Sequence, residues 1–560
     1  MRFLRLFTNS LLGGALGAAY LTILLLQLNP QVPLASQTVW RWYVTLGACY
    51  GTHLALLFYV TMLVREFFSV QIFSPGWISV RLLAWLSAAA AAVAATLMWL
   101  NLHAFPTLFD EAAARRFAFG AGATTASALV LLGIAIAHYS FGRRGSRVGA
   151  ALLAIAVTGS LALPIAARGP GGPLPIGARR VTLTAVPPRE SPRVTLLLLD
   201  GASLDFVWPR VAAGRLPNFG RVLDSGASMD LATIRPTQPD PVWAAVATGM
   251  YPAKNGVRSA ASYFARGDDR SLDLLPAHCF SHTLVRLGVL RDQPTTGAAW
   301  RARPLWEILA DYGLSAGVVR WPLTYPAQAI TGFLVTDRFH QLIGSMILPD
   351  PRAIYPPDIL PIARDAFAGS TGAQQWDEFY SRAARDVIAQ HPVQLEAVRF
   401  QGLDTTGHQY LKYAQPRAIG EVSDDERQRF GPVLERAYAA IDSEIGAAIA
   451  RQSPGDLLLV VSGFGMEPVT ALKHLAGRVL RDPDVSGTHE NAPDGFVLAY
   501  GSMIAAGRKQ RGSIVDVTPT LLYFFGVPIG RDMDGYARAD LFTAAFTAER
   551  PISFIPSHGR

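Results

Sequence analysis

The chain has 560 residues, which is too long for one ordinary domain, and half of them are apolar while only 16% are charged. Charges are sparse from Met1 to about Ala167 and ordinary in frequency afterwards, which indicates a membrane part joined to a globular part. The formal net charge of +8 is dispersed, without a basic run among aromatic residues, and this argues against nucleic acid as a partner. The two cysteines, Cys49 and Cys279, lie in different parts of the chain, so no disulfide framework is expected.

Residues 1–167 contain five hydrophobic stretches without Asp, Glu, Lys or Arg, each close to or above the roughly 20 residues that cross a bilayer. We expect them to form a five-helix transmembrane domain with the lipid bilayer as its partner. A cleaved signal peptide is a poor interpretation of the first stretch because four more follow. The stretches are Leu6–Leu28, Tyr43–Val64, Leu82–Phe109, Phe117–Gly142 and Val148–Ala167.

Arginine placement predicts the orientation of these spans, because basic residues favour the cytoplasmic side. Arginines precede the first span and border the loops between spans two and three and between spans four and five. We therefore expect a multi-pass inner-membrane protein with a cytoplasmic N-terminus. Five crossings then place the chain after Ala167 in the periplasm or an equivalent compartment. These arginines are Arg2, Arg5, Arg65, Arg81, Arg143, Arg144 and Arg147.

The residues after the last span read as a linker and then a soluble α/β domain. Residues 168–192 are rich in Gly and Pro and are expected to be extended. Short apolar runs, typical of strands buried on both faces, then alternate with helical patterns, which predicts a doubly wound sheet. The expected strands are Val194–Asp200, Ala316–Arg320, Phe333–Thr336, Ala397–Phe400 and Leu457–Ser462. The expected helices are Leu216–Ser225, Val242–Thr248, Pro304–Tyr312 and Val433–Ala450.

Three local signals suggest chemistry at the carboxyl ends of these strands, where ligands bind in such sheets. Asp200 ends the first strand, although an Asp there is commonly a turn residue or a helix cap. Asp404 and His408 are four residues apart, so a carboxylate and an imidazole can share one helix face and hold one divalent metal. His489 lies in a Gly-containing loop and is a weak signal alone.

Together with their neighbours, these residues resemble the alkaline phosphatase superfamily, in its type I phosphodiesterase and nucleotide pyrophosphatase branch. The resemblance covers about residues 193–545, leaves 546–560 as a tail, and makes segments 263–296 and 350–390 look like insertions over the ligand edge of the sheet. The matching segments are Leu198–Gly201, Leu216–Leu223, Ala247–Gly256, Arg303–Leu309, Trp321–Pro326, Asp404 with His408, Gly487–His489, Pro493–Phe496, Asp516–Leu522 and Arg531–Gly535.

This resemblance implies an alkaline-phosphatase-like doubly wound sheet with helices on both faces, and a site with two zinc ions that clamp a transferred phosphoryl group. One ion would be held by Asp404, His408 and His489. The other would need the strand-end Asp200, a Ser or Thr nucleophile and an adjacent Asp-His pair.

The sequence departs from this pattern in the second half of the site. Proline, which has no hydroxyl, stands at the nucleophile position as Pro239. Gly463 and Phe464, which cannot ligate a metal, stand where the Asp-His pair is expected, and Asn255 replaces a usual His. We therefore expect one divalent metal at Asp404, His408 and His489, with Asp200 as a remnant ligand. Zn²⁺ suits these ligands, and Mn²⁺ or Fe²⁺ would also suit them.

Three functional hypotheses follow. The first is a pseudoenzyme that keeps the fold and one metal to bind a ligand or partner. The second is an altered hydrolase or phosphoryl transferase acting on a phosphodiester small molecule or an envelope lipid head group. In it, Thr237 would supply a displaced hydroxyl, and Asp240, Glu467 or Glu490 would be weaker candidates for a role in catalysis. The third is a transport-associated membrane protein, which the absence of charged pairs in the spans disfavours. The sequence leaves the oligomeric state open.

Overall fold

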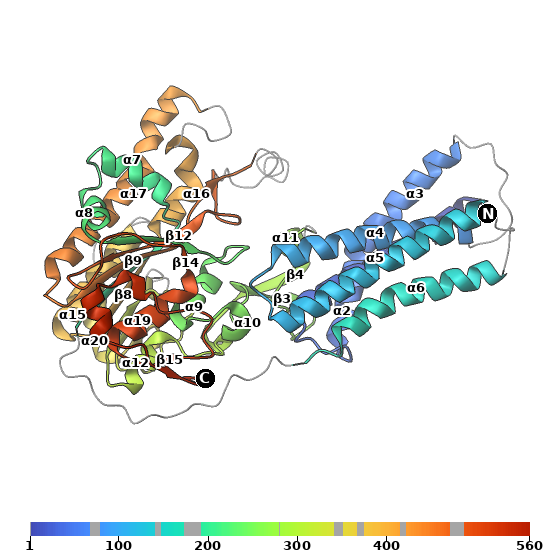
Figure 1. The fold of residues 1–560 in the computed structure, drawn as a ribbon. Helices are drawn as coiled ribbons and strands as arrows, with labels where there is room; N and C mark the ends of the chain where they lie inside the picture. Colours follow the sequence, from blue (N-terminus) through green and yellow to red (C-terminus); the bar gives the residue numbers. More distant parts are fainter. Residues whose placement is uncertain are drawn as a thin grey trace. The chain divides into compact units, whose positions relative to one another are not determined.

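The computed structural model describes residues 2–67, 79–140, 147–172, 192–278, 281–340, 351–366, 375–414, 422–470 and 486–559. The chain divides into two compact units, one of Met1–Pro175 with Ala261–Pro294 and one of Ile176–Ala260 with Thr295–Arg560 (Figure 1). We call them the helical unit and the α/β unit. Most of the expected linker, 173–191, lies outside the described residues.

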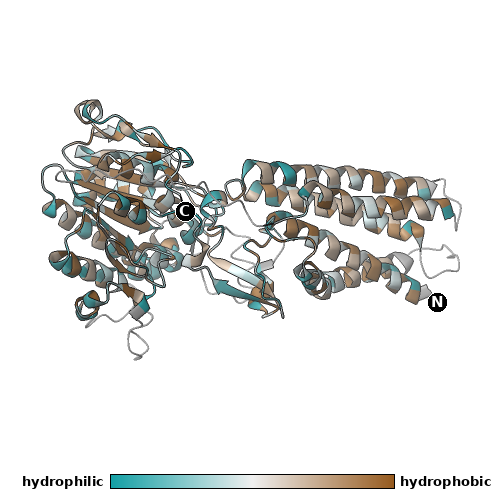
Figure 2. Ribbon diagram, turned by 90° about the horizontal axis from the view of Figure 1, so that it is seen from below, coloured by the Kyte–Doolittle hydropathy of each residue, from teal (hydrophilic) through white to brown (hydrophobic). Residues whose placement is uncertain are grey.

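The helical unit contains five helices that are long and apolar enough to cross a membrane, as expected. They are mostly white to brown in the hydropathy colours of Figure 2, with some teal segments. The second continues from α2 through a π-helical segment, Gly47–Gly51, into α3. The expected third span is shorter than predicted, because Phe105 leaves the helical conformation ahead of Pro106. The helices are α1 (Arg2–Leu28), α2 (Gln37–Leu46), α3 (Thr52–Phe67), α4 (Val80–Ala104), α5 (Glu111–Ser140) and α6 (Arg147–Arg168).

A β-hairpin also belongs to the helical unit. Strands β3 (Ala261–Ala265) and β4 (Leu290–Pro294) pair antiparallel, and α11 (Ser281–Arg286) precedes β4. The hairpin shares an apolar core with the ends of α1 and α2. The Asn29 side chain accepts from the backbone N–H groups of Asp273 and Leu274 and donates to the carbonyl of Leu274 at 2.8 Å. The expected insertion at 263–296 thus has its apolar core in the helical unit, because its described apolar residues are buried there.

The α/β unit is built on a ten-stranded mixed sheet in the order β13-β2-β12-β9-β1-β8-β5-β6-β7, with β14 also paired to β2. Its centre is parallel, as expected from the buried apolar runs. Strand β12 is antiparallel to both neighbours, and β7 is antiparallel to β6. The strands are β1 (Val194–Asp200), β2 (Ala227–Ala232), β5 (Ala316–Val319), β6 (Gly332–Val335), β7 (Ile354–Tyr355), β8 (Leu395–Phe400), β9 (Leu457–Phe464), β12 (Asp494–Tyr500), β13 (Gly507–Arg508) and β14 (Gly512–Ser513).

Helices cover both faces of this sheet, which confirms the predicted fold class (Figure 1). One face carries α7 (Leu204–Ala212), α8 (Pro217–Ser225), α15 (Gln375–Gln390) and α17 (Asp424–Arg451). The other carries α9 (Pro239–Thr248), α12 (Leu305–Asp311) and α19 (Val517–Phe525). Helix α17 begins earlier than predicted because Ser423 and Glu426 form a capping box. The insertion expected at 350–390 contributes α14 (Leu360–Asp365) and the layer helix α15, and residues 367–374 of it are outside the described part.

Two further groups of elements complete the unit. Helix α16 (Gly402–Ala414) follows β8 at the carboxyl edge of the sheet, and β10 (Glu467–Pro468) pairs with β11 (Gly487–Thr488) beyond β9. The chain then ends in α20 (Ala544–Glu549) and β16 (Phe554–Ile555), which pairs with β15 (Ile529–Gly530). Residues 546–559, part of the expected tail at 546–560, therefore pack on the α/β unit. Helix α10 (Pro252–Asn255) follows α9.

Candidate metal centre

The structure brings Asp404, His408 and His489 together at the carboxyl edge of the sheet. Asp404 and His408 lie one turn apart on α16, and His489 follows β11. One ligand atom from each residue lies within 4.8 Å of the others. The Nε2 atoms of His408 and His489 are 3.6 Å and 3.7 Å from Oδ1 of Asp404. This convergence is the arrangement that the sequence predicted for a single divalent metal.

Hydrogen bonds to backbone carbonyls orient both imidazoles. Nδ1 of His408 lies 2.8 Å from the carbonyl oxygen of Gly487, and Nδ1 of His489 lies 3.0 Å from that of Thr237. A carbonyl can only accept, so each Nδ1 donates a proton, and Nε2 is the nitrogen left to ligate a metal. Both Nε2 atoms lie near the Asp404 carboxylate, as in metal sites whose histidines are fixed by a second hydrogen bond.

The Asp404 carboxylate lacks a partner that its burial requires. Its Oδ1 atom is buried and makes no hydrogen bond within the described residues. Burial, and then the negative charge of Asp200, raise the pKa of Asp404, and the two histidines oppose them. A buried carboxylate oxygen without a donor is costly, and a divalent cation among the three ligand atoms would satisfy it. The residues present therefore fit one metal ion.

Asp200 does not join this group. It is fully buried at the end of β1, and the guanidinium of Arg399 on β8 binds both of its carboxylate oxygens. Nε1 of Trp243 donates a further hydrogen bond to Oδ1 at 2.6 Å. Burial alone would lower the pKa of Arg399, but the Asp200 charge and hydrogen bonds outweigh it and raise that pKa. An internal cation thus neutralises the carboxylate that we expected to ligate metal.

Protein atoms also fill the space around the other positions at which the family resemblance implied a second metal. A Cβ at Gly463 would lie 2.6 Å from Cγ1 of Val242 and 3.3 Å from the Trp243 ring, so the position has no room for a ligating side chain. Phe464 is fully buried with its ring 5.0 Å from that of His489. Pro239 opens α9, where its missing N–H is harmless.

Asn255 has a structural role in the turn after α9. Its side chain donates to the carbonyl of Met250 at 2.8 Å and accepts from the N–H of Val257 at 2.9 Å. The residue is fully buried, so this amide closes the turn rather than facing a metal.

Thr237 reaches the site through its backbone. Its carbonyl accepts the hydrogen bond from His489, whereas its hydroxyl is buried and donates to the carbonyl of Ile234 at 2.9 Å. The Thr237 hydroxyl, which we considered as a nucleophile displaced from position 239, is therefore already hydrogen-bonded. Of the other acids we considered, Glu467 is half-buried opposite Thr488 in the β10–β11 pair, and Glu490 is exposed.

Asp240, in the first turn of α9, is a further titratable group near this edge whose pKa is altered by its surroundings. Burial raises its pKa to about 6, Asp337 and Asp200 add to the effect, and Arg399 and Arg338 oppose it. Oδ1 of Asp337 is buried and makes no hydrogen bond within the part of the chain described. Sequence reasoning missed Arg399 and Asp337, although an arginine inside an apolar strand was a usable signal for a buried charge pair.

A convergent Asp-His-His group at the carboxyl edge of a mixed sheet, with helices on both faces, defines the class: an α/β domain with a candidate metal centre. Residues 194–518 match the family model described as type I phosphodiesterase / nucleotide pyrophosphatase. The chain therefore belongs to this family, whose members depend on metal ions, typically zinc.

Three solved structures match part of the chain. Murine ectonucleotide pyrophosphatase / phosphodiesterase 5 matches with 13% identity and a TM-score of 0.40, and covers 63% of this chain and 100% of its own. The human protein matches with 14% identity and a TM-score of 0.39, again with 63% and 100% covered. An inactive variant of the murine protein in complex with AMP matches with 12% identity, the same coverage and a TM-score of 0.40. A search of curated proteins found no match.

Proposed function

We propose that this protein is a membrane-anchored, one-metal member of its family that binds a phosphodiester-type ligand and has lost the two-metal mechanism. One observation carries the proposal. The orphaned Oδ1 of Asp404 faces two oriented imidazoles, while the Arg399 guanidinium holds the carboxylate of Asp200. The site therefore has ligands for one cation and an internal substitute for the other. Zn²⁺ fits these ligands best, and Mn²⁺ or Fe²⁺ are alternatives.

The proposed binding of a phosphodiester follows from the number of side chains that hold the metal. Three protein ligands leave a coordination position free, and a bound divalent metal polarises a phosphoryl oxygen placed there. The His408 side chain is 32% exposed, so this side of the site is reachable from solvent. We propose a phosphodiester of small size or an envelope lipid head group as the ligand, because the domain is tied to helices suited to a bilayer.

The same geometry argues for impaired catalysis. Pro239 supplies no hydroxyl, and the Thr237 hydroxyl donates to a carbonyl. No covalent phosphoryl intermediate can form on a proline side chain. The pseudoenzyme hypothesis is therefore our first proposal.

A second candidate is slow hydrolysis or transfer without a covalent nucleophile, and Asp240 favours it. A carboxyl with a pKa of about 6 is mostly ionised at neutral pH and can accept a proton from water. Such activity would rise as the pH passes through about 6, because the base must lose its own proton first.

We further propose the topology that the arginine pattern predicts. The N-terminus would be cytoplasmic, residues 1–167 would cross the inner membrane, and the domain at 193–545 would be periplasmic after a linker at 168–192. Five candidate spans support this arrangement. Labelling of cysteines introduced at Arg143 and at Arg215 with a membrane-impermeant reagent tests it, and labelling of the first but not the second would contradict it.

Metal content of the full-length protein in detergent tests the one-metal proposal. We expect one zinc per chain by elemental analysis, at least about 100-fold weaker metal binding in His408→Ala, and unchanged binding in the matched control His391→Ala. His391 follows α15 outside the metal group. Two metals per chain, or none, would overturn the proposal.

Turnover of a chromogenic phosphodiester then separates the two candidates. A rate equal in wild type and His408→Ala supports the pseudoenzyme. A rate that His408→Ala abolishes and Asp240→Asn lowers supports altered hydrolysis instead.

A further inference from the structure

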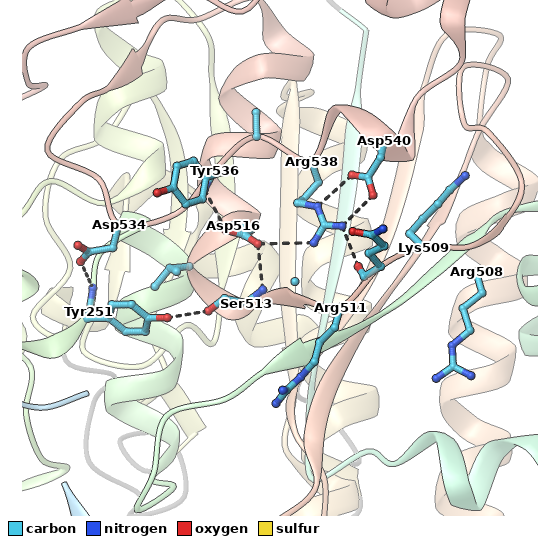
Figure 3. Close-up of a pocket in the computed structure, with 14 residues that line it drawn as sticks. Tyr251, Arg508, Lys509, Arg511, Ser513, Asp516, Asp534, Tyr536, Arg538 and Asp540 are labelled. Atoms are coloured by element: carbon cyan, nitrogen blue, oxygen red, sulfur yellow. Dashed lines mark hydrogen bonds and ion pairs between the residues drawn. The ribbon is translucent and has the colours of Figure 1, made fainter. Parts of the chain in front are cut away.

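A second concave site lies in the α/β unit, apart from the metal centre. It has a volume of about 870 Å³ and is lined by the β13–β14 turn, the 3₁₀ turn Ile514–Asp516, residues 534–540 and Tyr251 (Figure 3). Asp404, His408, His489 and Asp200 are not among its lining residues. The cavity is therefore independent of the proposed function.

The acidic residues that line the cavity already form hydrogen bonds or ion pairs within the protein. Asp516 accepts from the N–H groups of Ser513 and Tyr536, each at 2.9 Å. The Arg538 guanidinium binds Asp540 through Nε at 2.9 Å and Nη2 at 2.7 Å, and this hydrogen bonding lowers the pKa of Asp540. Asp534 accepts from the N–H of Tyr251 at 2.8 Å and pairs with Lys254 at 2.6 Å. These carboxylates serve to build the floor.

The cations at the rim of the cavity are at least partly exposed to solvent, and their described partners are partly exposed or weak. Arg508, Lys509 and Arg511 lie within four residues of the β13–β14 turn. The Arg508 and Arg511 side chains are 70% and 59% exposed and pair with Asp230 and Asp494. Exposed pairs of this kind contribute little and exchange readily. Nζ of Lys509 contacts only the Ala506 carbonyl, at 3.4 Å, in the described residues.

Hydroxyl and aromatic groups complete the cavity. The Tyr251 hydroxyl and Ser513 Oγ lie 3.1 Å apart on its wall, where either can donate to an oxygen ligand (Figure 3). Tyr536 is 77% exposed and offers an uncovered ring. Exposed positive charge above neutral donors suits an anion with several acceptor oxygens.

We propose that this cavity binds a ligand carrying at least two anionic charges on phosphate groups. Arg508, Lys509 and Arg511 contact the charges, and the Tyr251 and Ser513 hydroxyls contact the remaining oxygens. A soluble pyrophosphate-like ion and the phosphomonoester head group of a lipid share this chemistry.

Calorimetric titration of the full-length protein in neutral detergent tests the proposal. The protein carries His408→Ala and is kept in chelator, so the metal centre cannot bind the probe. Inorganic pyrophosphate and dihexanoyl phosphatidic acid are titrated separately at low salt. The triple variant Arg508→Gln, Lys509→Gln, Arg511→Gln should bind at least tenfold more weakly, and binding should also weaken with added salt. Arg215→Gln is the matched control, because Arg215 is 63% exposed and pairs with Glu435.

Each binding result either supports the proposed anion site or contradicts it. Pyrophosphate binding that the triple variant loses supports a soluble ligand, and binding of the lipid alone supports a head group. Absence of binding by both probes, or an equal loss in the triple variant and Arg215→Gln, overturns the proposal. Calorimetric titration of Tyr251→Phe is a second test, because removing one hydroxyl should weaken binding of the probe severalfold while the charge at the rim stays the same. Thermal unfolding checks that each variant is folded.

Discussion

The two buried carboxylates of the candidate site, Asp404 and Asp200, differ in the groups that surround them. Asp404 keeps two imidazoles within 3.7 Å and an oxygen without a donor. Asp200 has both oxygens covered by Arg399 and a contact from Trp243. A buried negative charge needs a cation, and the chain supplies that cation itself in one half only. The comparison teaches that two buried carboxylates at one sheet edge can have different surroundings: Arg399 pairs with Asp200, whereas two imidazoles that could share a metal ion surround Asp404.

The largest effect is expected from removing the internal cation. Arg399→Ala leaves Asp200 buried and unpaired, which should cost roughly 3–5 kcal/mol in the free energy of unfolding. Chemical unfolding of the full-length protein in detergent measures this loss. The exposed pair of Arg215 and Glu435 provides the control, since Arg215→Ala should cost under about 1 kcal/mol.

The double variant Arg399→Ala, Asp200→Asn sharpens the test. It should recover part of the stability, because a neutral amide is cheaper to bury than a carboxylate. A single variant as stable as wild type would contradict the view that Arg399 acts as a cation for Asp200.

Rebuilding the lost ligand should fail for steric reasons. In Gly463→Asp the new Cβ meets Val242 at 2.6 Å, so we expect a loss of roughly 1–3 kcal/mol and no second metal. Elemental analysis measures the metal content, and thermal unfolding measures the loss of stability. Gly463→Ala should show a similar steric loss, and two metals in Gly463→Asp would mean that the half-site is open after all.

Metal removal should destabilise the protein in a pH-dependent way. The pKa of Asp404 is raised in the folded chain, so the metal-free protein loses stability as the pH rises through that value and its carboxylate ionises without a partner. Bound metal removes this cost, and at low pH protonated histidines release the metal. The difference in Tm between metal-loaded and chelated protein should therefore be larger at pH 7.5 than at pH 5. A difference that grows toward low pH would contradict Asp404 as a ligand.

The smallest effect is expected at Thr237. Its hydroxyl bonds a carbonyl, whereas its own carbonyl orients His489, and a side-chain change leaves that carbonyl in place. Thr237→Ala should change metal affinity by less than about threefold, since a single neutral hydrogen bond is worth about 1 kcal/mol or less. A loss of phosphodiester turnover of 100-fold or more in this variant would instead identify Thr237 as a nucleophile.

The preserved half of the site was predictable because its signal is local. Asp404 and His408 share a helix face through their spacing alone, and the apolar runs of β1 and β9 predicted their places in a buried sheet. The Arg399–Asp200 pair joins residues 199 positions apart, and nothing local reveals which buried acid an arginine will meet. The antiparallel β12 was missed for a similar reason, because strand direction depends on connections rather than on composition.

The unit to which the hairpin of residues 261–294 belongs was not predictable, because its apolar residues, such as Tyr263 and Leu290, could have been buried in either unit. Hydrophobicity indicates that a residue is covered, but the covering partner follows only from the complete fold.

That hairpin also sets the order in which the protein can be assembled. The chain leaves the α/β unit after Ala260, contributes residues 261–294 to the helical unit and returns at Thr295. The helical unit is therefore complete only after residues 261–294, well beyond its last helix, have been synthesised. A cut between the helices and residue 193 would leave the hairpin without its covering helices. Since the N–H of Thr295 lies 2.9 Å from the carbonyl oxygen of Ala260, a short turn in place of the hairpin is the natural route to a free-standing domain.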